Sequence, residues 1–231
     1  MHYDLISFDL DGTLVDTAVE IAAAANLALT AHGIAERPLA EITALIGAGT
    51  RELMRRVLAR CVEEKPSLAQ RVPFDALMAS FDEHYANTTG TSAAPYAGCR
   101  EALTLLQQAG VRLACTTNKE LRHTERVLAV TALDGFFDLV IGGDSLAEKK
   151  PHRSVLEHVM RTLRSSAART AHVGDSSIDV QAARNAGVRA WVVPYGYNGG
   201  QPIESANPDK VFPGLLDVAH HALNQGTVSS R

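Results

Sequence analysis

The chain has 231 residues, of which 46% are hydrophobic and 21% are charged, and this composition is typical of a globular protein rather than a disordered or collagen-like one. The length exceeds that of a typical single domain, so it predicts one core with a sizeable insertion. The formal net charge of −4 leaves no cationic excess to neutralise a nucleic-acid backbone or an anionic membrane, and neither is expected as a partner.

The first half of the chain predicts one strand followed by helices. A short apolar strand covers 5–11 and is broken by a Gly-Thr pair, and an alanine-rich helix over 18–31 stops at Gly33. From there to about Ser92 the pattern is helical, with no strand. The helical signals are a start at Pro38 near Leu39, a helix capped by Thr50 that runs to Cys61, and apolar residues at helical spacing at Phe74, Leu77, Met78, Phe81 and Tyr85.

The second half alternates between helices and strands, after a small, polar and proline-bounded run at 88–95 that we interpret as a linker. The predicted helices cover 97–109, 119–133, 152–164 and 177–186, and the predicted strands cover 111–116, 137–141, 170–173 and 188–193. Such alternation predicts a parallel sheet with helices on both faces. We therefore expect an α/β fold, with a Rossmann-like doubly wound parallel sheet core over 1–15 and 93–231 and an inserted α-helical domain over 16–92.

Polar side chains gather where these strands end, and open parallel sheets bind ligands at that edge. The residues are Asp9 and Asp11 after the first strand, Thr116, Thr117 and Asn118 after the second, Asp144 after the third, and Gly174 and Asp175 after the fourth. If the first strand persists to Asp11, the carboxylates of Asp9 and Asp11 point to the same side. Carboxylates that close repel, which predicts a bound cation or a shared proton. An Asx turn at Asp11 would explain that residue alone.

Four segments resemble, in order, the four motifs of the haloacid dehalogenase-like hydrolases. The segments are 8–16 (FDLDGTLVD), 116–119 (TTNK), 149–152 (KKPH) and 174–179 (GDSSID). The resemblance covers essentially the whole chain, and the helical insertion corresponds to the family's cap. A finer similarity, to the phosphoglycolate phosphatase-like branch, lies in 141–144 (IGGD) and 195–198 (YGYN).

The resemblance implies a phosphatase that works through an aspartyl-phosphate, with 2-phosphoglycolate as the leading substrate. Asp9 is the implied nucleophile and Asp11 the implied general acid and base. The implied metal ligands are Asp9, Asp175 and the backbone carbonyl of Asp11, and such hard oxygen ligands suit Mg²⁺, the expected cofactor. The implied phosphoryl-binding residues are Thr117 and Lys150, with Asn118 beside them.

Several assignments stay open at this level. Lys150 matches the family position, and Lys149 is the alternative; Asp179 is either a partner of metal-bound water or an ordinary acid on a helix face. Arg153 stands where the family often has a second proline, which concerns the rigidity of the loop more than the chemistry.

The segment 46–51 (IGAGTR) lies in the helical insertion. It could be taken for a dinucleotide fingerprint, but Glu52 stands where the third glycine belongs and no β-α-β unit surrounds it. In a cap, these glycines let the backbone approach the active site closely. Arg51 would then bind a substrate carboxylate, or else lie on a solvated helix face.

Two other functions compete with a phosphoglycolate phosphatase. A phospho-acceptor receiver module also uses acids, a threonine and a lysine on a parallel sheet, but it is much smaller and has no helical insertion after its first strand. A phosphomutase of the β-phosphoglucomutase type would share the aspartyl-phosphate and pass it to a sugar instead of water. A phosphatase for a sugar or amino-sugar phosphate stays open as well.

Further patterns bear on location and partners. No apolar run approaches the roughly 20 residues that span a bilayer, and residues 1–4 lack signal-peptide features, so we expect a cytoplasmic protein, monomeric or homodimeric. Cys61, Cys99 and Cys115 are far apart, which argues against a disulfide framework or a zinc site. Cys115 and Trp191 are expected in the core, and the nine histidines show no metal-binding spacing.

Overall fold

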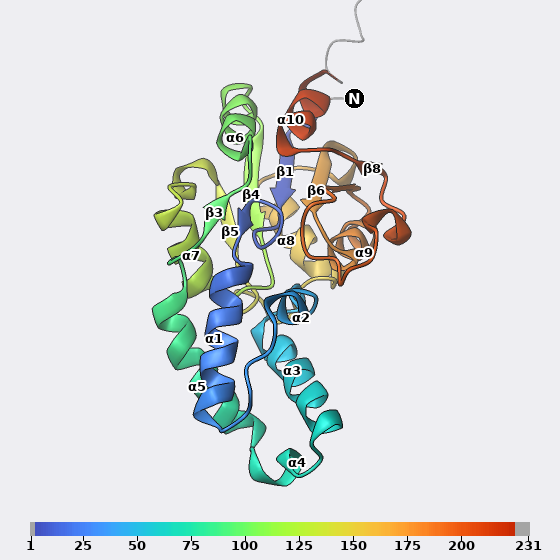
Figure 1. The fold of residues 1–231 in the computed structure, drawn as a ribbon. Coiled ribbons are helices and arrows are strands. Elements are labelled where there is room, and N and C mark those ends of the chain that lie inside the picture. The colour runs from blue at the N-terminus through green and yellow to red at the C-terminus, as the bar shows by residue number, and fades with distance from the viewer. Residues whose placement is uncertain (1–2, 225–231) are drawn as a thin grey trace, which may run out of the picture.

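The structure, a computed structural model, describes residues 3–224. The predictions made for residues 1, 2 and 225–231 lie outside the described residues. Figure 1 shows a sheet flanked by helices in one part of the molecule and a group of helices, α1 to α5, in the other.

The helices are α1 (Ala18–Ala31), α2 (Leu39–Thr43), α3 (Thr50–Glu64), α4 (Leu68–Arg71), α5 (Phe74–Thr88), α6 (Cys99–Gln108), α7 (Leu121–Val130), α8 (Arg153–Thr162), α9 (Ser177–Ala186) and α10 (Leu215–Asn224). The strands are β1 (Leu5–Phe8), β2 (Val15–Asp16), β3 (Ala94–Pro95), β4 (Arg112–Thr116), β5 (Leu139–Ile141), β6 (Thr170–Gly174), β7 (Arg189–Val192) and β8 (Lys210–Val211). Short 3₁₀ helices cover Asp134–Phe136, Ala167–Arg169 and Ile203–Ala206.

Six strands form one parallel sheet in the order β5-β4-β1-β6-β7-β8. The chain starts in the middle of this sheet, builds outward to β4 and β5 on one side, and then returns to β6, β7 and β8 on the other. The strand order therefore reverses beside β1, and a crevice for ligands is expected at the carboxyl ends of β4, β1 and β6. The predicted α/β doubly wound sheet is confirmed.

Helices cover both faces of the sheet because each strand buries side chains on both sides. Ile6 and Phe8 of β1 belong to a buried cluster with α6, α7 and α10, and Leu5 belongs to a second cluster with α8 and α9. Continuous apolar strands of this kind are typical of parallel sheets. Cys115 and Trp191 lie in the first cluster, as predicted.

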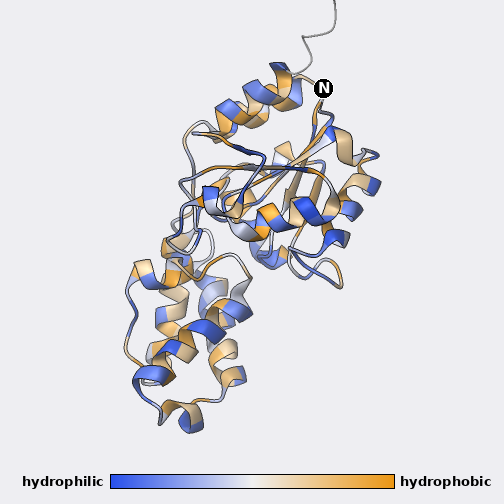
Figure 2. Ribbon diagram, turned by 90° about the vertical axis from the view of Figure 1, so that its right-hand side faces the viewer, coloured by the Kyte–Doolittle hydropathy of each residue, from blue (hydrophilic) through white to orange (hydrophobic). Residues whose placement is uncertain are grey.

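Helices α1 to α5 bury a third hydrophobic cluster of their own. Helix α1 contributes mainly small side chains, which allows it to lie close against α5, where Phe81 and Tyr85 are fully buried. Figure 2 shows this helical group projecting from the sheet part of the molecule. The division into two domains at 15/16 and 92/93 stays a prediction.

Two chain segments connect the sheet part to the helices, and they pair as β2 and β3, a short antiparallel ribbon that the sequence did not predict. Just beyond it, Thr17 holds the cap position of α1, and Asp16 Oδ1 accepts from the Ala18 N–H at 3.2 Å. The Tyr197 hydroxyl accepts from the N–H groups of Thr17 and Ala18 at 2.9 and 3.1 Å. Residues from the end of the sheet part thus hold the start of the helical part.

Two local predictions need correction, and one further strand was not predicted. Strand β1 ends at Phe8, not Asp11, because the chain turns at Gly12, where φ is +86°. Helix α3 begins at Thr50, so Gly49 and not Thr50 holds the cap position. Strand β8 escaped prediction because two residues carry no periodicity.

Within residues 3–224, no helix has the length and apolar character needed to cross a bilayer.

Candidate active site

Asp9 lies directly beyond β1, and its N–H still donates to the Val173 carbonyl of β6 at 2.9 Å. The following turn needs Gly12, because a Cβ at that position would lie only 2.5 Å from Oδ2 of Asp175. The missing side chain lets the turn after β1 pack against the turn after β6. Carboxylates from two strand ends therefore meet at the switch point of the sheet.

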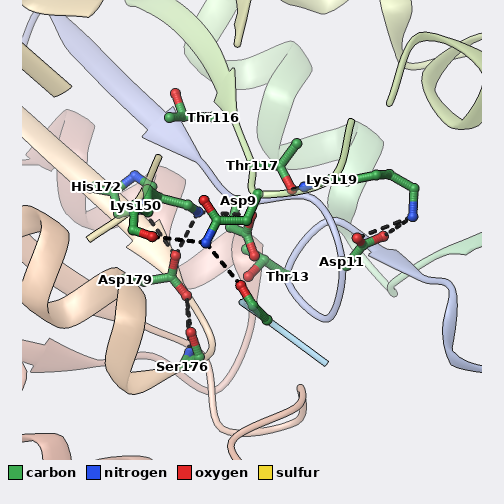
Figure 3. Close-up of polar contacts among 12 residues, drawn as sticks. Asp9, Asp11, Thr13, Thr116, Thr117, Lys119, Lys150, His172, Ser176 and Asp179 are labelled. Carbon is green, nitrogen blue, oxygen red and sulfur yellow. Dashed lines mark hydrogen bonds and ion pairs between the residues drawn. The ribbon is translucent and has the colours of Figure 1, made fainter. Parts of the chain in front are cut away.

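Lys150 holds the first of two ion-pair groups at this edge. Its Nζ donates to Asp9 Oδ1 at 2.9 Å and to Asp179 Oδ1 at 2.7 Å, and Figure 3 shows the lysine between the two carboxylates. Its side chain is only 2% exposed. Lys149 instead donates to the Ala48 carbonyl at 2.7 Å, so Lys150 is the lysine that reaches the acids.

Asp179 is a buried member of this group and not an acid on a solvated helix face. It forms a capping box with Ser176 at the start of α9, where its Oδ2 accepts from Ser176 Oγ at 2.6 Å. Its Oδ1 also lies 3.2 Å from Nε2 of His172, a buried residue of β6 whose Nδ1 is 3.0 Å from Ser7 Oγ. A Cβ on Gly174 would collide with Asp179, so the glycine of the fourth motif makes this contact possible.

Asp175 completes an acidic cluster with Asp9 and Asp179, in which one oxygen of each residue lies within 4.8 Å of the others. Its Oδ1 accepts from Thr13 Oγ1 at 2.8 Å, and its Oδ2 accepts from the backbone N–H of Tyr197. Among the described residues, this is the cluster of acidic side chains that could hold a metal ion. The carboxylate of Asp11 does not belong to it, which leaves its backbone carbonyl for the implied metal contact.

The pKa values show an excess of negative charge in this cluster. Burial raises the pKa of Asp9 to about 6, against the opposing effect of Lys150. Burial and the neighbouring acids Asp179 and Asp9 raise the pKa of Asp175 well above its usual range. Burial would also raise the pKa of Asp179, but Lys150 and His172 outweigh it and hold that pKa below its usual range. One lysine does not balance three buried carboxylates, and a cation would relieve the imbalance.

Lys119 forms the second ion-pair group, which the sequence analysis did not identify. Its Nζ donates to the two oxygens of Asp11 at 2.9 and 3.1 Å, and its side chain is 1% exposed. Thr17 Oγ1 donates to the same carboxylate at 2.6 Å. Figure 3 shows this pair apart from the Lys150 group. The signal was present in the TTNK segment, whose last residue is Lys119, but nothing in the sequence indicates its partner.

A chamber opens beside Asp9 and the Lys119–Asp11 pair, with an empty volume of about 390 Å³ including its mouth. Its floor comes from the sheet part and its roof from helices α1, α3 and α5 and the loop before α3. The floor residues are Asp9, Asp11, Thr117, Asn118 and Lys119, and the roof residues are Ile21, Ile46, Gly47, Gly49, Thr50, Leu53 and Tyr85. The glycine-rich loop therefore approaches the acids closely, as a cap loop was expected to do.

Thr117 and Asn118 both line the chamber, but Asn118 also has a structural role. Its Nδ2 donates to the Gly47 carbonyl at 3.0 Å and to the Lys150 carbonyl at 2.9 Å, so it ties the roof loop to the lysine loop. Thr117 is buried beside it, and its Oγ1 accepts from the Lys119 N–H at 3.2 Å.

Three other singled-out residues lie away from the chamber lining. Arg51 pairs with Asp75 at 2.7 Å, its side chain is 57% exposed, and it lines a separate groove that Lys149 and Lys150 also border. Thr116 is buried in β4, where it accepts from Ser7 Oγ at 2.9 Å. Asp144 accepts from the first N–H of α7 at 2.7 Å and thereby caps that helix.

The fold and the site together define an α/β protein with buried carboxylates and lysines at a topological switch point, under a helical roof. The chain belongs to the haloacid dehalogenase-like hydrolase family, whose sequence model matches residues 6–193. This confirms the family resemblance of the four motifs.

Similar proteins place the chain in the expected branch of that family. A phosphoglycolate phosphatase of Nitrosospira multiformis is 38% identical over 224 residues, which cover 94% of this chain and 96% of that protein. A plasmid-encoded phosphoglycolate phosphatase of Cupriavidus necator is 40% identical over 194 residues, covering 84% and 82%. The crystal structure of a predicted phosphoglycolate phosphatase from Haemophilus somnus superposes with a TM-score of 0.88 at 29% identity, covering 94% and 97%.

Proposed function

We propose that this chain is a Mg²⁺-dependent phosphatase that hydrolyses small phosphate monoesters, with 2-phosphoglycolate as its substrate. The observation that carries the proposal is the arrangement of Asp9, which is buried beside Lys150 and two further acids and lines a small chamber under the helical roof. A phosphoryl group is a dianion, so a carboxylate can attack it only where cations offset the charge.

The acidic cluster fits a Mg²⁺ ion. Its donors are carboxylate oxygens, which are the hard ligands that Mg²⁺ prefers. Burial and neighbouring acids raise the pKa values of Asp9 and Asp175, so a bound cation would stabilise their ionised forms. Asp9, Asp175 and the backbone carbonyl of Asp11 would hold the ion. When bound, it supplies charge neutralisation for the nucleophile and the phosphoryl oxygens. Asp179, already bonded to Lys150 and His172, is suited to hold Lys150 in place instead.

Each side chain then has one task in the reaction. Asp9 attacks phosphorus in line with the leaving oxygen and becomes an aspartyl-phosphate. Lys150 and Thr117 hold phosphoryl oxygens, and Asn118 keeps their two loops together. Asp11 donates a proton to the leaving oxygen and later removes one from the water that attacks the aspartyl-phosphate. This attack breaks the bond between phosphorus and the Asp9 oxygen, so inorganic phosphate leaves and the carboxylate of Asp9 is restored.

The chamber favours a small substrate. Ile21, Ile46 and Leu53 close its roof with apolar surface, which excludes water and leaves little room beyond the reacting phosphate. The relatives of Nitrosospira multiformis and Cupriavidus necator are named for phosphoglycolate, a phosphate ester of only nine heavy atoms. Both considerations support 2-phosphoglycolate over a sugar phosphate. We also expect a cytoplasmic monomer or homodimer that needs no nucleic acid or membrane.

A substrate panel tests the proposal. Phosphate release is measured with Mg²⁺ from 2-phosphoglycolate and from sugar, amino-sugar and nucleotide phosphates, with Asp9→Asn as the blank. The expected result is the highest kcat/KM for 2-phosphoglycolate and no release in excess chelator. A higher kcat/KM for a sugar phosphate would refute the substrate, and conversion of β-glucose 1-phosphate to glucose 6-phosphate would indicate a mutase.

A further inference from the structure

The chamber contains one cation among its lining residues within 3–224, and that cation is Lys119. Arg51 and Lys149 border the separate groove, where Arg51 is paired with Asp75. A ligand with a second negative charge, beyond its phosphoryl group, therefore meets Lys119 when it enters the chamber. The proposed function does not use this lysine.

Lys119 lies close to the expected position of the leaving group, because it is bonded to the proposed general acid. Its Nζ is 2.9 and 3.1 Å from the two oxygens of Asp11, the residue proposed to protonate the leaving oxygen. In 2-phosphoglycolate the carboxyl carbon is two bonds from that oxygen. A cation one hydrogen bond away from the acid is thus next to the carboxylate of the departing glycolate.

A second group points to the same ligand chemistry. Tyr85 lines the chamber and is fully buried, and its O–H has no acceptor among the described residues. The Lys119 Nζ lies 5.1 Å from the centre of the Tyr85 ring. A buried hydroxyl without an acceptor is costly, and a carboxylate bound beside Lys119 would supply one.

We propose that Lys119 and the Tyr85 hydroxyl bind the carboxylate of the leaving group and so select small phospho-acids over neutral phosphate esters. The inference rests on the proposed function for the identity of the acid, but the site itself is defined by these two side chains. It moves the expected carboxylate contact from Arg51, on the outer side of α3, to the floor of the chamber.

The test separates binding from turnover by means of an inhibitor pair. The compound 3-phosphonopropionate is a non-hydrolysable copy of 2-phosphoglycolate, and 3-phosphonopropionamide is its neutral isostere. Inhibition constants for both are measured against p-nitrophenyl phosphate hydrolysis with Mg²⁺ present, or dissociation constants by calorimetry for variants of low activity. The readout is the preference, the ratio of the amide constant to the carboxylate constant.

Wild-type protein is expected to prefer the carboxylate by about 30-fold or more, as is typical when one partner of a desolvated charge pair is removed. Lys119→Gln, which can still donate to Asp11, should bring the ratio close to one, and Lys119→Arg should retain most of it. Lys149→Gln and Arg51→Gln, the matched controls, should leave it unchanged. Tyr85→Phe should lower it about tenfold, through loss of one hydrogen bond to a charged group.

Three outcomes would overturn the proposal: a wild-type ratio near one, an unchanged ratio in Lys119→Gln, or loss of the ratio in Arg51→Gln alone. If Lys119→Gln does not fold, the wild-type ratio and Tyr85→Phe decide, because Tyr85→Phe keeps the ring and removes only the hydroxyl. Failure of the proposed function is seen separately. In that case the wild-type protein does not hydrolyse 2-phosphoglycolate, yet it prefers the carboxylate inhibitor and the Lys119→Gln variant does not. The two results together would mean that the same site selects another phospho-acid.

Discussion

The Lys150 group and the Lys119 group differ in which part of the molecule carries the partners of the lysine. Lys150 lies among Asp9, Asp179 and His172, all carried by the sheet part, and its ammonium group donates hydrogen bonds to the first two of these. Lys119 bonds Asp11 and lies against the ring of Tyr85, which belongs to α5. Under the proposed roles, the residues that act on the phosphoryl group of every substrate are separated in space from Lys119 and Tyr85, which would contact the leaving group. Substitutions in the first group should affect all substrates alike, and those in the second should depend on the leaving group.

The largest effect is expected from Asp9→Asn. A neutral amide is a poor nucleophile and a weaker metal ligand, so kcat should fall by about 10³-fold or more for every substrate. Phosphate release from 2-phosphoglycolate and from p-nitrophenyl phosphate measures it. Retention of more than about a tenth of wild-type kcat on either would remove Asp9 from the nucleophile role.

Asp11→Asn should separate the two kinds of leaving group. General acid catalysis is typically worth about 10²- to 10⁴-fold, and an alkyl ester needs it more than an activated aryl ester does. The loss in kcat/KM should therefore be much larger for 2-phosphoglycolate than for p-nitrophenyl phosphate. Equal losses on the two substrates would contradict the general acid role.

Lys150→Met should lower activity without regard to the leaving group. Loss of a preorganised cation beside the phosphoryl oxygens typically costs about 10²- to 10³-fold in kcat, and the same factor is expected for both substrates. Asp9 and Asp179 would be left buried without their partner, so the free energy of unfolding should fall by about 3–5 kcal/mol. Lys149→Met, the neighbouring control, should change neither quantity; a substrate-dependent loss in Lys150→Met would break the comparison between the two groups.

The pKa of Asp9 predicts a pH dependence of metal binding. Because burial raises this pKa to about 6, a proton competes with the metal for Asp9 below that pH, whereas the carboxylate is ionised above it. Mg²⁺ affinity should fall about tenfold between pH 7.5 and pH 5 from this group alone. Calorimetric titration across that range measures it, and an affinity independent of pH would mean that Asp9 is not a ligand.

The smallest effect is expected from Arg51→Ala. Both partners of the Arg51–Asp75 pair are largely exposed, at 57% and 84%, so the unfolding free energy should change by less than about 1 kcal/mol. Chemical denaturation of the variant and of Asp75→Ala measures it. A loss well above 1 kcal/mol would show that this pair stabilises the helical part more than exposed ion pairs usually do.

Much of the fold and of the acidic centre could be predicted from the sequence. The alternation of β-branched strands and helices after residue 93 gave the parallel sheet, since periodicity is a local property of the chain. The four motifs placed Asp9, Asp175 and Lys150 together because the carboxyl ends of parallel strands meet at one edge. The predicted end of the first strand was wrong because the chain turns at Gly12. Packing of this turn against Asp175, a residue distant in sequence, leaves no room for a side chain there.

The contacts between the two parts could not be predicted, because they depend on how the roof lies over the sheet. No periodicity or spacing in the sequence around Lys119 predicts its contacts with Asp11 and with the ring of Tyr85. Tyr85 was identified only as an apolar residue of a helix, and burial of its hydroxyl in the chamber became visible only in three dimensions. Arg51, chosen for its charge beside two glycines, turns toward α5 because Asp75 and the Phe74 ring lie there.

The most direct test of the account is to trap the phosphoryl group on the enzyme. Protein is mixed with ³²P-labelled 2-phosphoglycolate and Mg²⁺ and quenched in acid within one turnover. One portion is counted for protein-bound ³²P. The other is reduced with borohydride, which releases the phosphate and converts a phosphorylated aspartate to homoserine, and is analysed by peptide mass spectrometry. We expect protein-bound ³²P in the wild-type protein, homoserine at position 9 after reduction, and neither of these in Asp9→Asn. Turnover without any label on Asp9, or label on another residue, would contradict the account.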